Sequence, residues 1–144
     1  ETVLFEGGRP VMLVPTGWTR PSGDTVGVAW NRSTETARLI GQSLPLLRAA
    51  RRAVVIEIEG WSIPGPDGAA LVDYLRLHGV AAEGVTGPRS MRGPGLDVLD
   101  QAEANNVDLL LKGAYTQSRL RQMIFGGATS DIIADATMPV VFAH

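Results

Sequence analysis

Apolar residues gather in five short runs along the chain, separated by polar and amphipathic segments. The runs cover residues 25–30, 53–58, 80–85, 107–111 and 139–143. The second and fourth runs are almost continuous in Val, Ile and Leu, which is typical of strands that are buried on both faces. Ala and Gly dilute the third run. The pattern therefore predicts five strands.

Helical patterns lie between these runs. Residues 33–50 carry apolar side chains at spacings of three and four, with Ser33 as the expected N-cap and Pro45 as an expected break. Similar segments follow at residues 67–77, 96–104 and 129–136. Because strands alternate with helices, we expect a mainly parallel, five-stranded, doubly wound α/β sheet.

The first 24 residues do not fit this single unit. Residues 8–14 and 137–143 share a proline followed by apolar residues, and residues 15–24 are rich in Pro, Gly and Ser, as in a linker. We interpret residues 1–24 as the tail of a preceding copy of the domain, with a helix end, a strand at 10–14 and a linker. Residues 25–144 are then the domain itself. An ordinary extra edge strand is the alternative, and the absence of an initial Met suggests a processed chain or a fragment.

Composition narrows the function classes. The 144 residues include no cysteine, which excludes disulfides and thiol chemistry, and the net charge of -2 gives no general attraction to nucleic acid or to an anionic membrane. No apolar run is long enough to cross a membrane and no signal peptide is visible, so we expect a cytoplasmic protein. His78 and His144 are isolated, and no metal site is expected.

Charged clusters elsewhere have ordinary interpretations. Asp97, Asp100 and Glu103 share a helix face at a spacing of three, and we expect that face to be solvated. Arg89 and Arg92 lie among glycines and prolines in residues 87–95, where we expect a mobile loop.

Two regions of the chain resemble one known family. They are residues 26–33 (VGVAWNRS) and residues 107–129, with VDLLLKGAY, SRLR and FGGAT as the matching segments. These segments resemble bacterial universal stress protein domains, over residues 25–144 and most strongly over 107–144. Residues 1–24 resemble the junction in tandem members, so the chain resembles a second domain carrying the last strand of a first. The resemblance implies an adenine nucleotide alpha hydrolase-like fold, with strand order 3-2-1-4-5 plus an additional N-terminal strand.

In this order the sheet reverses between its first and fourth strands, and ligands bind outside the carboxyl ends of the strands at such a reversal. Nucleotide-binding members carry a motif of three glycines and a Ser or Thr, whose positions here are Gly113, Thr116, Gly126 and Gly127. Thr129 and Ser130 lie close enough along the chain to replace the hydroxyl that Gly127 lacks. The candidate cofactor-binding residues are Asn31, Ser33, Lys112, Gly113, Thr116, Gly126, Gly127, Ala128 and Thr129.

Three of these positions depart from the family motif. Thr116 replaces a glycine, and a left-handed backbone there would cost roughly 1–2 kcal/mol. Gly127 removes a hydroxyl, and Asn31 stands where nucleotide-binding members have Asp; its amide can both donate and accept. The neighbouring Arg32 is expected to be a solvated turn residue. We therefore expect a degenerate site that binds ATP or AMP weakly or not at all, with Mg²⁺ present only if ATP is bound.

The resemblance implies a stress-response binding and regulatory module. Two alternatives stay open. One is slow ATP hydrolysis at the same crevice, although the sequence shows no clear metal-binding carboxylate or base at the loop. The other is a purely structural dimerisation domain. An apolar edge strand invites pairing. We expect a homodimer or a tandem-domain partner through the edge at 139–143, with residues 10–14 antiparallel to it, within one chain or by exchange.

Overall fold

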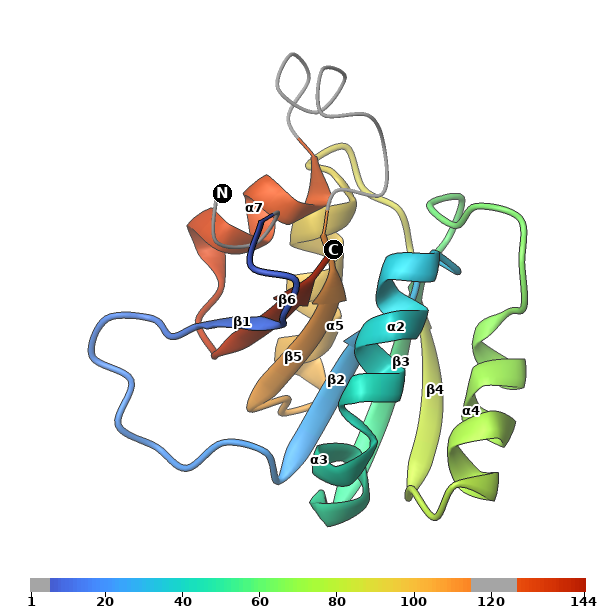
Figure 1. Ribbon diagram of the computed structural model, residues 1–144. Coiled ribbons are helices and arrows are strands. Elements are labelled where there is room, and N and C mark those ends of the chain that lie inside the picture. Colours follow the sequence, from blue (N-terminus) through green and yellow to red (C-terminus); the bar gives the residue numbers. More distant parts are fainter. Residues whose placement is uncertain (1–5, 115–126) are drawn as a thin grey trace.

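The computed structural model describes residues 6–114 and 127–144 of the chain (Figure 1). A six-stranded sheet runs through the molecule, with helices on both sides. The elements, in chain order, are β1 (Val11–Leu13), β2 (Thr25–Ala29), α2 (Thr34–Gln42), α3 (Leu44–Ala49), β3 (Arg52–Ile58), α4 (Gly68–Leu77), β4 (Ala82–Gly87), α5 (Pro94–Ala104), β5 (Leu109–Gly113), α7 (Ala128–Asp135) and β6 (Val140–Ala143).

The strand order confirms the expected topology. The order is β1-β6-β5-β2-β3-β4, and all neighbours are parallel except β1 and β6. The order reverses between β2 and β5, which are paired directly, with Ala29 opposite Lys112. The antiparallel pair places Val11 opposite Phe142, which confirms the expected pairing of the N-terminal strand within one chain.

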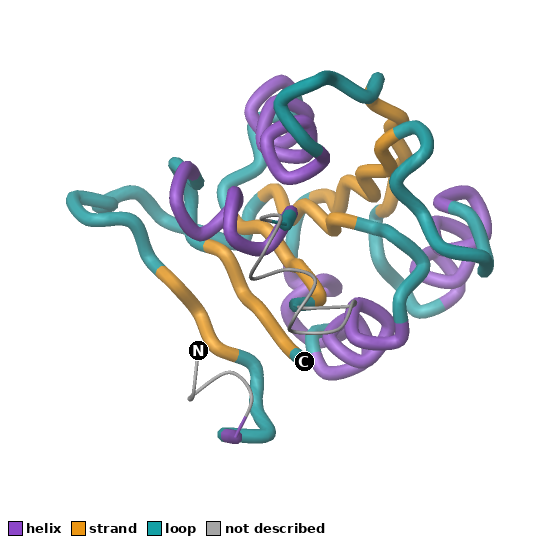
Figure 2. The backbone as a smooth tube through the Cα atoms, turned by 90° about the horizontal axis from the view of Figure 1, so that it is seen from above, coloured by secondary structure: helices purple, strands orange, loops and turns teal. Residues whose placement is uncertain are grey.

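Two layers of helices cover the sheet. Helices α2, α3 and α4 lie on one face, and α5 and α7 lie on the other (Figures 1 and 2). Strand β5 shows why the sequence runs are continuous: Leu109 and Leu111 pack toward the α2 side, whereas Leu110 packs toward the α5 side. A strand buried on both faces needs apolar residues at every position.

Several helix boundaries follow local signals in the sequence. The Ser33 hydroxyl accepts a hydrogen bond from the Thr36 amide at 3.3 Å and caps α2, as expected. The break at Pro45 also occurs, because α2 ends before it and Pro45 lies in the first turn of α3. Asp67 caps α4 by accepting from the Ala70 amide at 2.9 Å.

Two strands begin later than their apolar runs predict. Val80 is buried, but its amide bonds to the Leu75 carbonyl, so it closes the end of α4 and β4 starts at Ala82. Val107 does the same at the end of α5, where its amide bonds to the Ala102 carbonyl. An apolar residue just after a helix commonly packs back onto the last turn.

The segment before β2 is tied to the domain by one carboxylate. Asp108 accepts hydrogen bonds from the amides of Gly23, Asp24 and Thr25, at 2.7, 3.2 and 3.1 Å. These bonds fix where the chain enters the sheet. The division into a tail at 1–24 and a domain at 25–144 stays a prediction.

The expected solvated acidic face is wrong for one of its three members. The Asp97 side chain is buried, and its carboxylate accepts from the amide and hydroxyl of Ser90. Burial raises the pKa of Asp97, but the Ser90 bonds and the charges of Arg89 and Arg92 outweigh it and leave the pKa lowered. Arg92 pairs with Asp100. These contacts tie down parts of the 87–95 loop, whose mobility stays a prediction.

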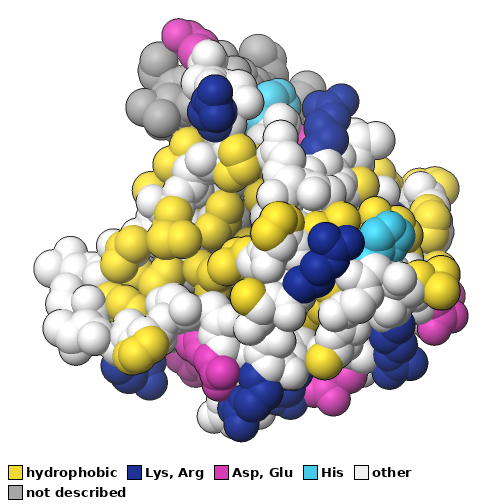
Figure 3. All heavy atoms as spheres, turned by 60° about the horizontal axis from the view of Figure 1, so that its bottom comes forward, with side chains coloured by type: hydrophobic (Ala, Val, Ile, Leu, Met, Phe, Trp, Pro, Cys, Tyr) yellow, Lys and Arg dark blue, Asp and Glu magenta, His cyan; other side chains and the backbone are white. Residues whose placement is uncertain are grey.

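The exposed apolar residues include three consecutive ones around β1. Met12, Leu13 and Val14 are exposed, and Figure 3 shows apolar side chains gathered over this part of the molecule. Across residues 6–114 and 127–144, no helix combines the length and the apolar character that crossing a membrane requires.

Candidate functional site

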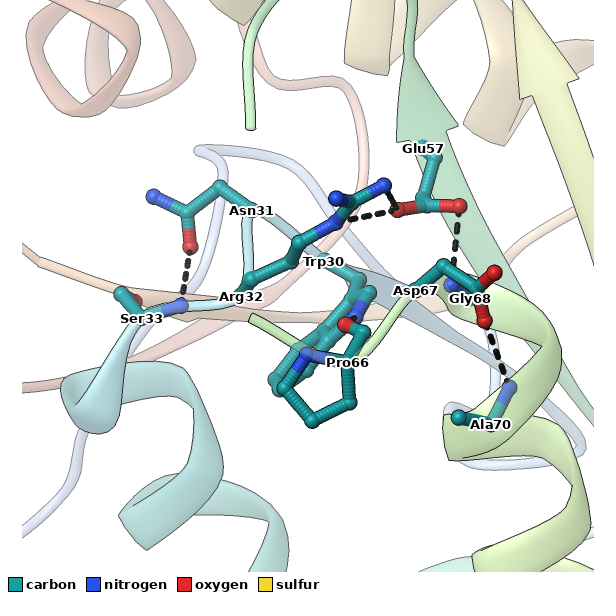
Figure 4. A network of polar contacts seen from close by, with 9 residues as sticks. All are labelled: Trp30, Asn31, Arg32, Ser33, Glu57, Pro66, Asp67, Gly68 and Ala70. Atoms are coloured by element: carbon teal, nitrogen blue, oxygen red, sulfur yellow. Dashed lines mark hydrogen bonds and ion pairs between the residues drawn. The ribbon is translucent and has the colours of Figure 1, made fainter. Parts of the chain in front are cut away.

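The turn after β2 brings polar side chains to the carboxyl edge of the sheet. The Trp30 amide bonds to the Ile56 carbonyl at 2.9 Å, and the Trp30 indole donates to the Pro66 carbonyl at 3.0 Å (Figure 4). These bonds hold the turn against β3 and the segment before α4. Asn31 follows directly, and it is only 4% exposed.

Asn31, Ser33 and Gly113 are brought together by a residue that sequence reasoning missed. The Asn31 carbonyl oxygen accepts from the Ser33 amide and from the Thr36 hydroxyl, both at 3.3 Å. The Thr36 hydroxyl oxygen accepts from the Gly113 amide at 3.2 Å. Thr36 therefore links the end of β2 to the end of β5. We call these four residues, Asn31, Ser33, Thr36 and Gly113, the α2 wall.

Gly113 permits a close approach between two parts of the protein. A Cβ atom at this position would lie 2.5 Å from the backbone nitrogen of Thr36, much closer than real Cβ atoms come. Glycine is thus required by the packing of α2 against the end of β5, whether or not a ligand is present. Gly113 therefore has a structural reason here as well as the functional one that the sequence suggested.

Arg32 is a correction to the sequence analysis, which expected a solvated turn residue. Its guanidinium pairs with Glu57 at 3.2 Å, and the side chains of Arg32 and Glu57 are only 29% and 15% exposed. The second Glu57 oxygen accepts from the Gly68 amide at 2.8 Å, at the start of α4 (Figure 4). Arg32 holds a backbone φ of 66°, which is rare for a residue with a side chain. The ion pair stabilises that unusual turn.

Lys112 lies on the opposite face of the sheet from the α2 wall. Its side chain is 2% exposed and stands between its in-register neighbours Ala29 and Phe142. The ammonium donates to the Gly113 carbonyl and lies 5.4 Å from the centroid of the Trp61 ring. Burial lowers the pKa of Lys112 to about 8, and the charge of Glu35 acts in the opposite direction. We call Lys112 and Trp61 the Lys112 wall.

The remaining candidate residues begin α7. Gly127 is the N-cap and makes no side-chain capping bond, Ala128 is the first helical residue, and Thr129 is buried. This helix starts at the end of the sheet where the parallel strands finish (Figure 1). Thr116 and Gly126 lie outside the described residues, as does the rest of the segment that joins β5 to α7.

Helix α5 packs closely on the start of α7. A Cβ atom on Gly95 would lie 2.6 Å from the Cβ of Asp131 and 2.7 Å from the Ala128 carbonyl oxygen. Burial, together with the charge of Asp135, raises the pKa of Asp131. An ionised Asp131 carboxylate in this first turn would oppose the binding of an anion there.

Metal-binding groups and grooves elsewhere in the described structure are the other kinds of candidate site. Within the part of the chain that the structure describes, no group of three or more His, Cys, Asp or Glu side chains could hold a metal ion. A groove of about 470 Å³ lies away from the β2–β5 junction, between α4 and the ends of β3 and β4, and its lining includes Glu57, Asp73 and Arg76.

Solved structures of universal stress proteins share this architecture. No family model matches the chain, and no curated protein does. A universal stress protein from Archaeoglobus fulgidus DSM 4304 superposes with a TM-score of 0.72 at 16% identity, over 94% of this chain and 50% of that one. A universal stress protein in complex with cAMP gives 0.66 at 18% identity, over 84% and 96% of the two chains.

A third structure, of the universal stress protein from Archaeoglobus fulgidus in complex with dAMP, gives a TM-score of 0.58 at 18% identity. The match covers 83% of this chain and 96% of that one. The chain spans about half the length of the first of these proteins and nearly all of the other two. With its parallel sheet, its order reversal and its extra antiparallel strand, the chain has the fold of the universal stress proteins.

Proposed function

We propose that this chain is a nucleotide-binding regulatory domain of the universal stress protein type, which binds an adenine mononucleotide at the carboxyl edge between β2 and β5. The observation that carries the proposal is the reversal of strand order at this junction. Buried polar residues, Asn31, Ser33 and Lys112, stand at the ends of these two strands or directly after them. Reversals in parallel sheets are where such folds bind ligands.

The ligand class is supported by two of the similar structures. One is described in complex with cAMP and the other in complex with dAMP. Both ligands join an adenine base to a single phosphate. On the basis of the same resemblance we also propose a cytoplasmic role in the stress response.

The affinity is expected to be modest. The Asn31 oxygen already accepts two hydrogen bonds inside the protein, and Gly127 offers an amide but no hydroxyl. With Thr116 in place of a motif glycine, three contacts of the full motif are altered. Mg²⁺ would enter only together with the phosphates of ATP.

The test begins with the purified chain. Mass spectrometry of small molecules released on denaturation should find an adenine nucleotide, and calorimetry should detect binding of AMP, cAMP or ATP. The double variant Thr116→Gly with Gly127→Ser should bind more tightly, because it restores the motif. Gly41→Ser, at an exposed position of α2, is the matched control and should change nothing. Absence of released nucleotide, together with no binding at millimolar concentration, would overturn the proposal.

One observation favours a second candidate, a purely structural domain. Arg32 and Glu57 pair with each other, and the residues of the α2 wall hydrogen-bond among themselves, so both sets of contacts form without any ligand. Slow ATP hydrolysis, the third reading of the sequence, predicts turnover that falls when the crevice is mutated. The same purified samples therefore separate the three candidates.

Assembly through the β6 edge also stays a proposal. Strand β1 pairs with β6 in this chain, and the adjoining Met12 and Val14 are 52% and 55% exposed. Apolar residues exposed at an edge strand favour a homodimer or a partner domain. Sedimentation of the chain with and without residues 1–15 tests this, and an identical stable monomer in both cases would exclude it.

A further inference from the structure

Lys112 is the single lysine of this protein. The chain carries 13 basic residues, and every one of the others is an arginine. The residue types differ in a way that bears on function, because a lysine can lose its proton near physiological pH when it is buried and an arginine cannot. The one residue of this kind is buried at the junction where we propose that a ligand binds.

The ammonium of Lys112 reaches across the end of β2. Lys112 belongs to β5, whereas Trp61 follows β3, and β2 lies between these two strands in the sheet. The ammonium nevertheless lies 5.4 Å from the centroid of the Trp61 ring. It is therefore placed over the end of β2, at the reversal of strand order.

The partners of this ammonium are too few for its burial. An ammonium has three donors, and the one hydrogen bond that Lys112 makes with the described residues goes to the Gly113 carbonyl. The ion pairs found within residues 6–114 and 127–144 do not include Lys112. A buried charge normally needs a partner of opposite sign, and the Trp61 ring supplies only a weaker attraction.

Packing alone gives no reason for a lysine at this position. The side chain is 2% exposed, so its charged end does not reach water, and the neighbours in register are Ala29 and Phe142. Methionine or leucine would fill the same space without burying a charge. The lysine thus lowers stability at a place where an apolar residue would not.

We propose that Lys112 is the cation that binds the phosphate group of the ligand, and that the anion completes the hydrogen bonding of its ammonium. This inference rests on the proposed function, because it assigns the phosphate of the adenine nucleotide to the Lys112 wall. The base would then lie toward the α2 wall, whose groups are uncharged. Lys112 also becomes a specificity residue that separates nucleotides from nucleosides.

Phosphate binding at Lys112 is coupled to its protonation. Burial lowers the pKa of Lys112 to about 8, and a bound anion raises it, so Lys112 takes up protons when the ligand binds near or above that pH. The other charged or titratable groups on the elements that pack against the two faces of β5 are Glu35 and Arg38 of α2, Asp97, Asp100 and Glu103 of α5, Asp131 and Asp135 of α7, and His144 after β6. The negative charge of Glu35 raises the pKa of Lys112 and so acts against the effect of burial. Affinity should be flat below pH 8 and should fall by up to about tenfold per pH unit above it.

The first experiment compares AMP with adenosine by calorimetry on the full chain. Lys112→Met should weaken AMP binding about tenfold or more and leave adenosine binding unchanged, since only AMP carries the phosphate. Wild-type affinity for AMP should be about tenfold lower at pH 9 than at pH 7, and Lys112→Met should lose this dependence. Arg38→Met removes an exposed cation from α2 and should behave as wild type.

The second experiment needs neither a variant nor a nucleotide. With ¹⁵N-labelled lysine, nuclear magnetic resonance reports on one side chain, and its pKa can be followed with and without pyrophosphate. Pyrophosphate should raise the pKa. Suppose that wild type binds AMP, but pyrophosphate leaves the pKa of Lys112 unchanged and Lys112→Met leaves the ratio of AMP to adenosine affinity unchanged. The inference is then wrong and the proposed function stands. If pyrophosphate raises the pKa while no nucleotide binds, the anion site stands and the proposed function is wrong.

Discussion

The α2 wall and the Lys112 wall stand on opposite faces of the same sheet edge, and they treat their polar groups differently. In the α2 wall, Asn31, Ser33, Thr36 and Gly113 are buried and bonded to one another. In the Lys112 wall, the contacts of the buried ammonium with described residues are a hydrogen bond to one carbonyl and a position over one aromatic ring. A network whose polar groups bond to one another stabilises the fold, whereas a buried charge with few hydrogen-bond partners favours a complex with an anion. Under the proposed function, the α2 wall is therefore mainly scaffold, and the Lys112 wall is mainly binding site.

The largest expected effect is on the pH dependence of stability, and it concerns the Lys112 wall. The pKa of Lys112 is about 8 in the folded chain and near its ordinary value of 10.5 in the unfolded chain, so the unfolded chain binds more protons between these values. The free energy of unfolding therefore rises with pH through this window and is lowest below pH 8. Lys112→Met should be more stable than wild type at pH 7. This difference in the free energy of unfolding should shrink by about 2–3 kcal/mol between pH 7 and pH 10.

Urea unfolding at a series of pH values measures this difference. Every other titratable group is common to both proteins, so its contribution cancels in the comparison. Arg38→Met should run parallel to wild type throughout. Parallel curves for Lys112→Met and wild type would show that the ammonium is not destabilised by burial, and the contrast between the walls would disappear.

The next effect concerns the close packing of Gly113 against the start of α2. Gly113→Ala would bring a methyl group within 2.5 Å of the Thr36 backbone nitrogen, and a backbone atom at a helix start has little room to move. We expect a loss of about 1–3 kcal/mol in the free energy of unfolding. Gly41→Ala is the control, because no atom lies within 4 Å of its added methyl group, and it should gain up to about 1 kcal/mol in α2. Equal effects at the two glycines would contradict the close packing of this wall.

A smaller loss should follow from opening the network without changing its volume. Thr36→Val removes the hydroxyl that accepts from the Gly113 amide and donates to Asn31. The buried amide is then left without its acceptor, and we expect a loss of about 1–2 kcal/mol by thermal or urea unfolding. Thr34→Val, at an exposed position two residues earlier, should stay within about 0.5 kcal/mol of wild type. If the two valine variants match, the α2 wall is not held by its hydrogen bonds.

The smallest effect tests the ion pair that extends the α2 wall toward α4. Glu57→Gln keeps an oxygen for the Gly68 amide but removes the charge that pairs with Arg32. A partly exposed pair contributes about 0.5–1 kcal/mol, and this loss should diminish at high salt. Glu59→Gln, at an exposed position just beyond β3, is the control. A salt-independent loss at Glu57 would indicate that the hydrogen bonds, and not the charge, hold the turn.

Local signals in the sequence predicted much of the fold. The apolar runs, the Ser33 cap and the break at Pro45 depend on neighbours within a few residues, and the structure confirms them. The errors at Val80 and Val107 arose because a run of apolar letters does not say which residues pack back onto the preceding helix. The strand order came from the resemblance, which is information about whole folds.

The candidate site was predictable only in part. Asn31, Ser33, Lys112 and Gly113 were identified from their places at the ends of strands together with the family resemblance, but the sequence put them into one undivided crevice. Their separation into two walls depends on which face of β5 each side chain takes, and on partners far along the chain. Thr36 lies 77 residues from Gly113, and no spacing rule relates them.

The sequence by itself determined the alternation of strands and helices, because period and capping are local properties of the backbone. It also determined that the chain has a single lysine. Only the tertiary structure decided that this lysine is buried beside Trp61, that Arg32 is held by Glu57, and that Gly113 lies against α2. These facts depend on the long-range packing of β2, β3 and β5, which sets the electric environment and the free space around each side chain.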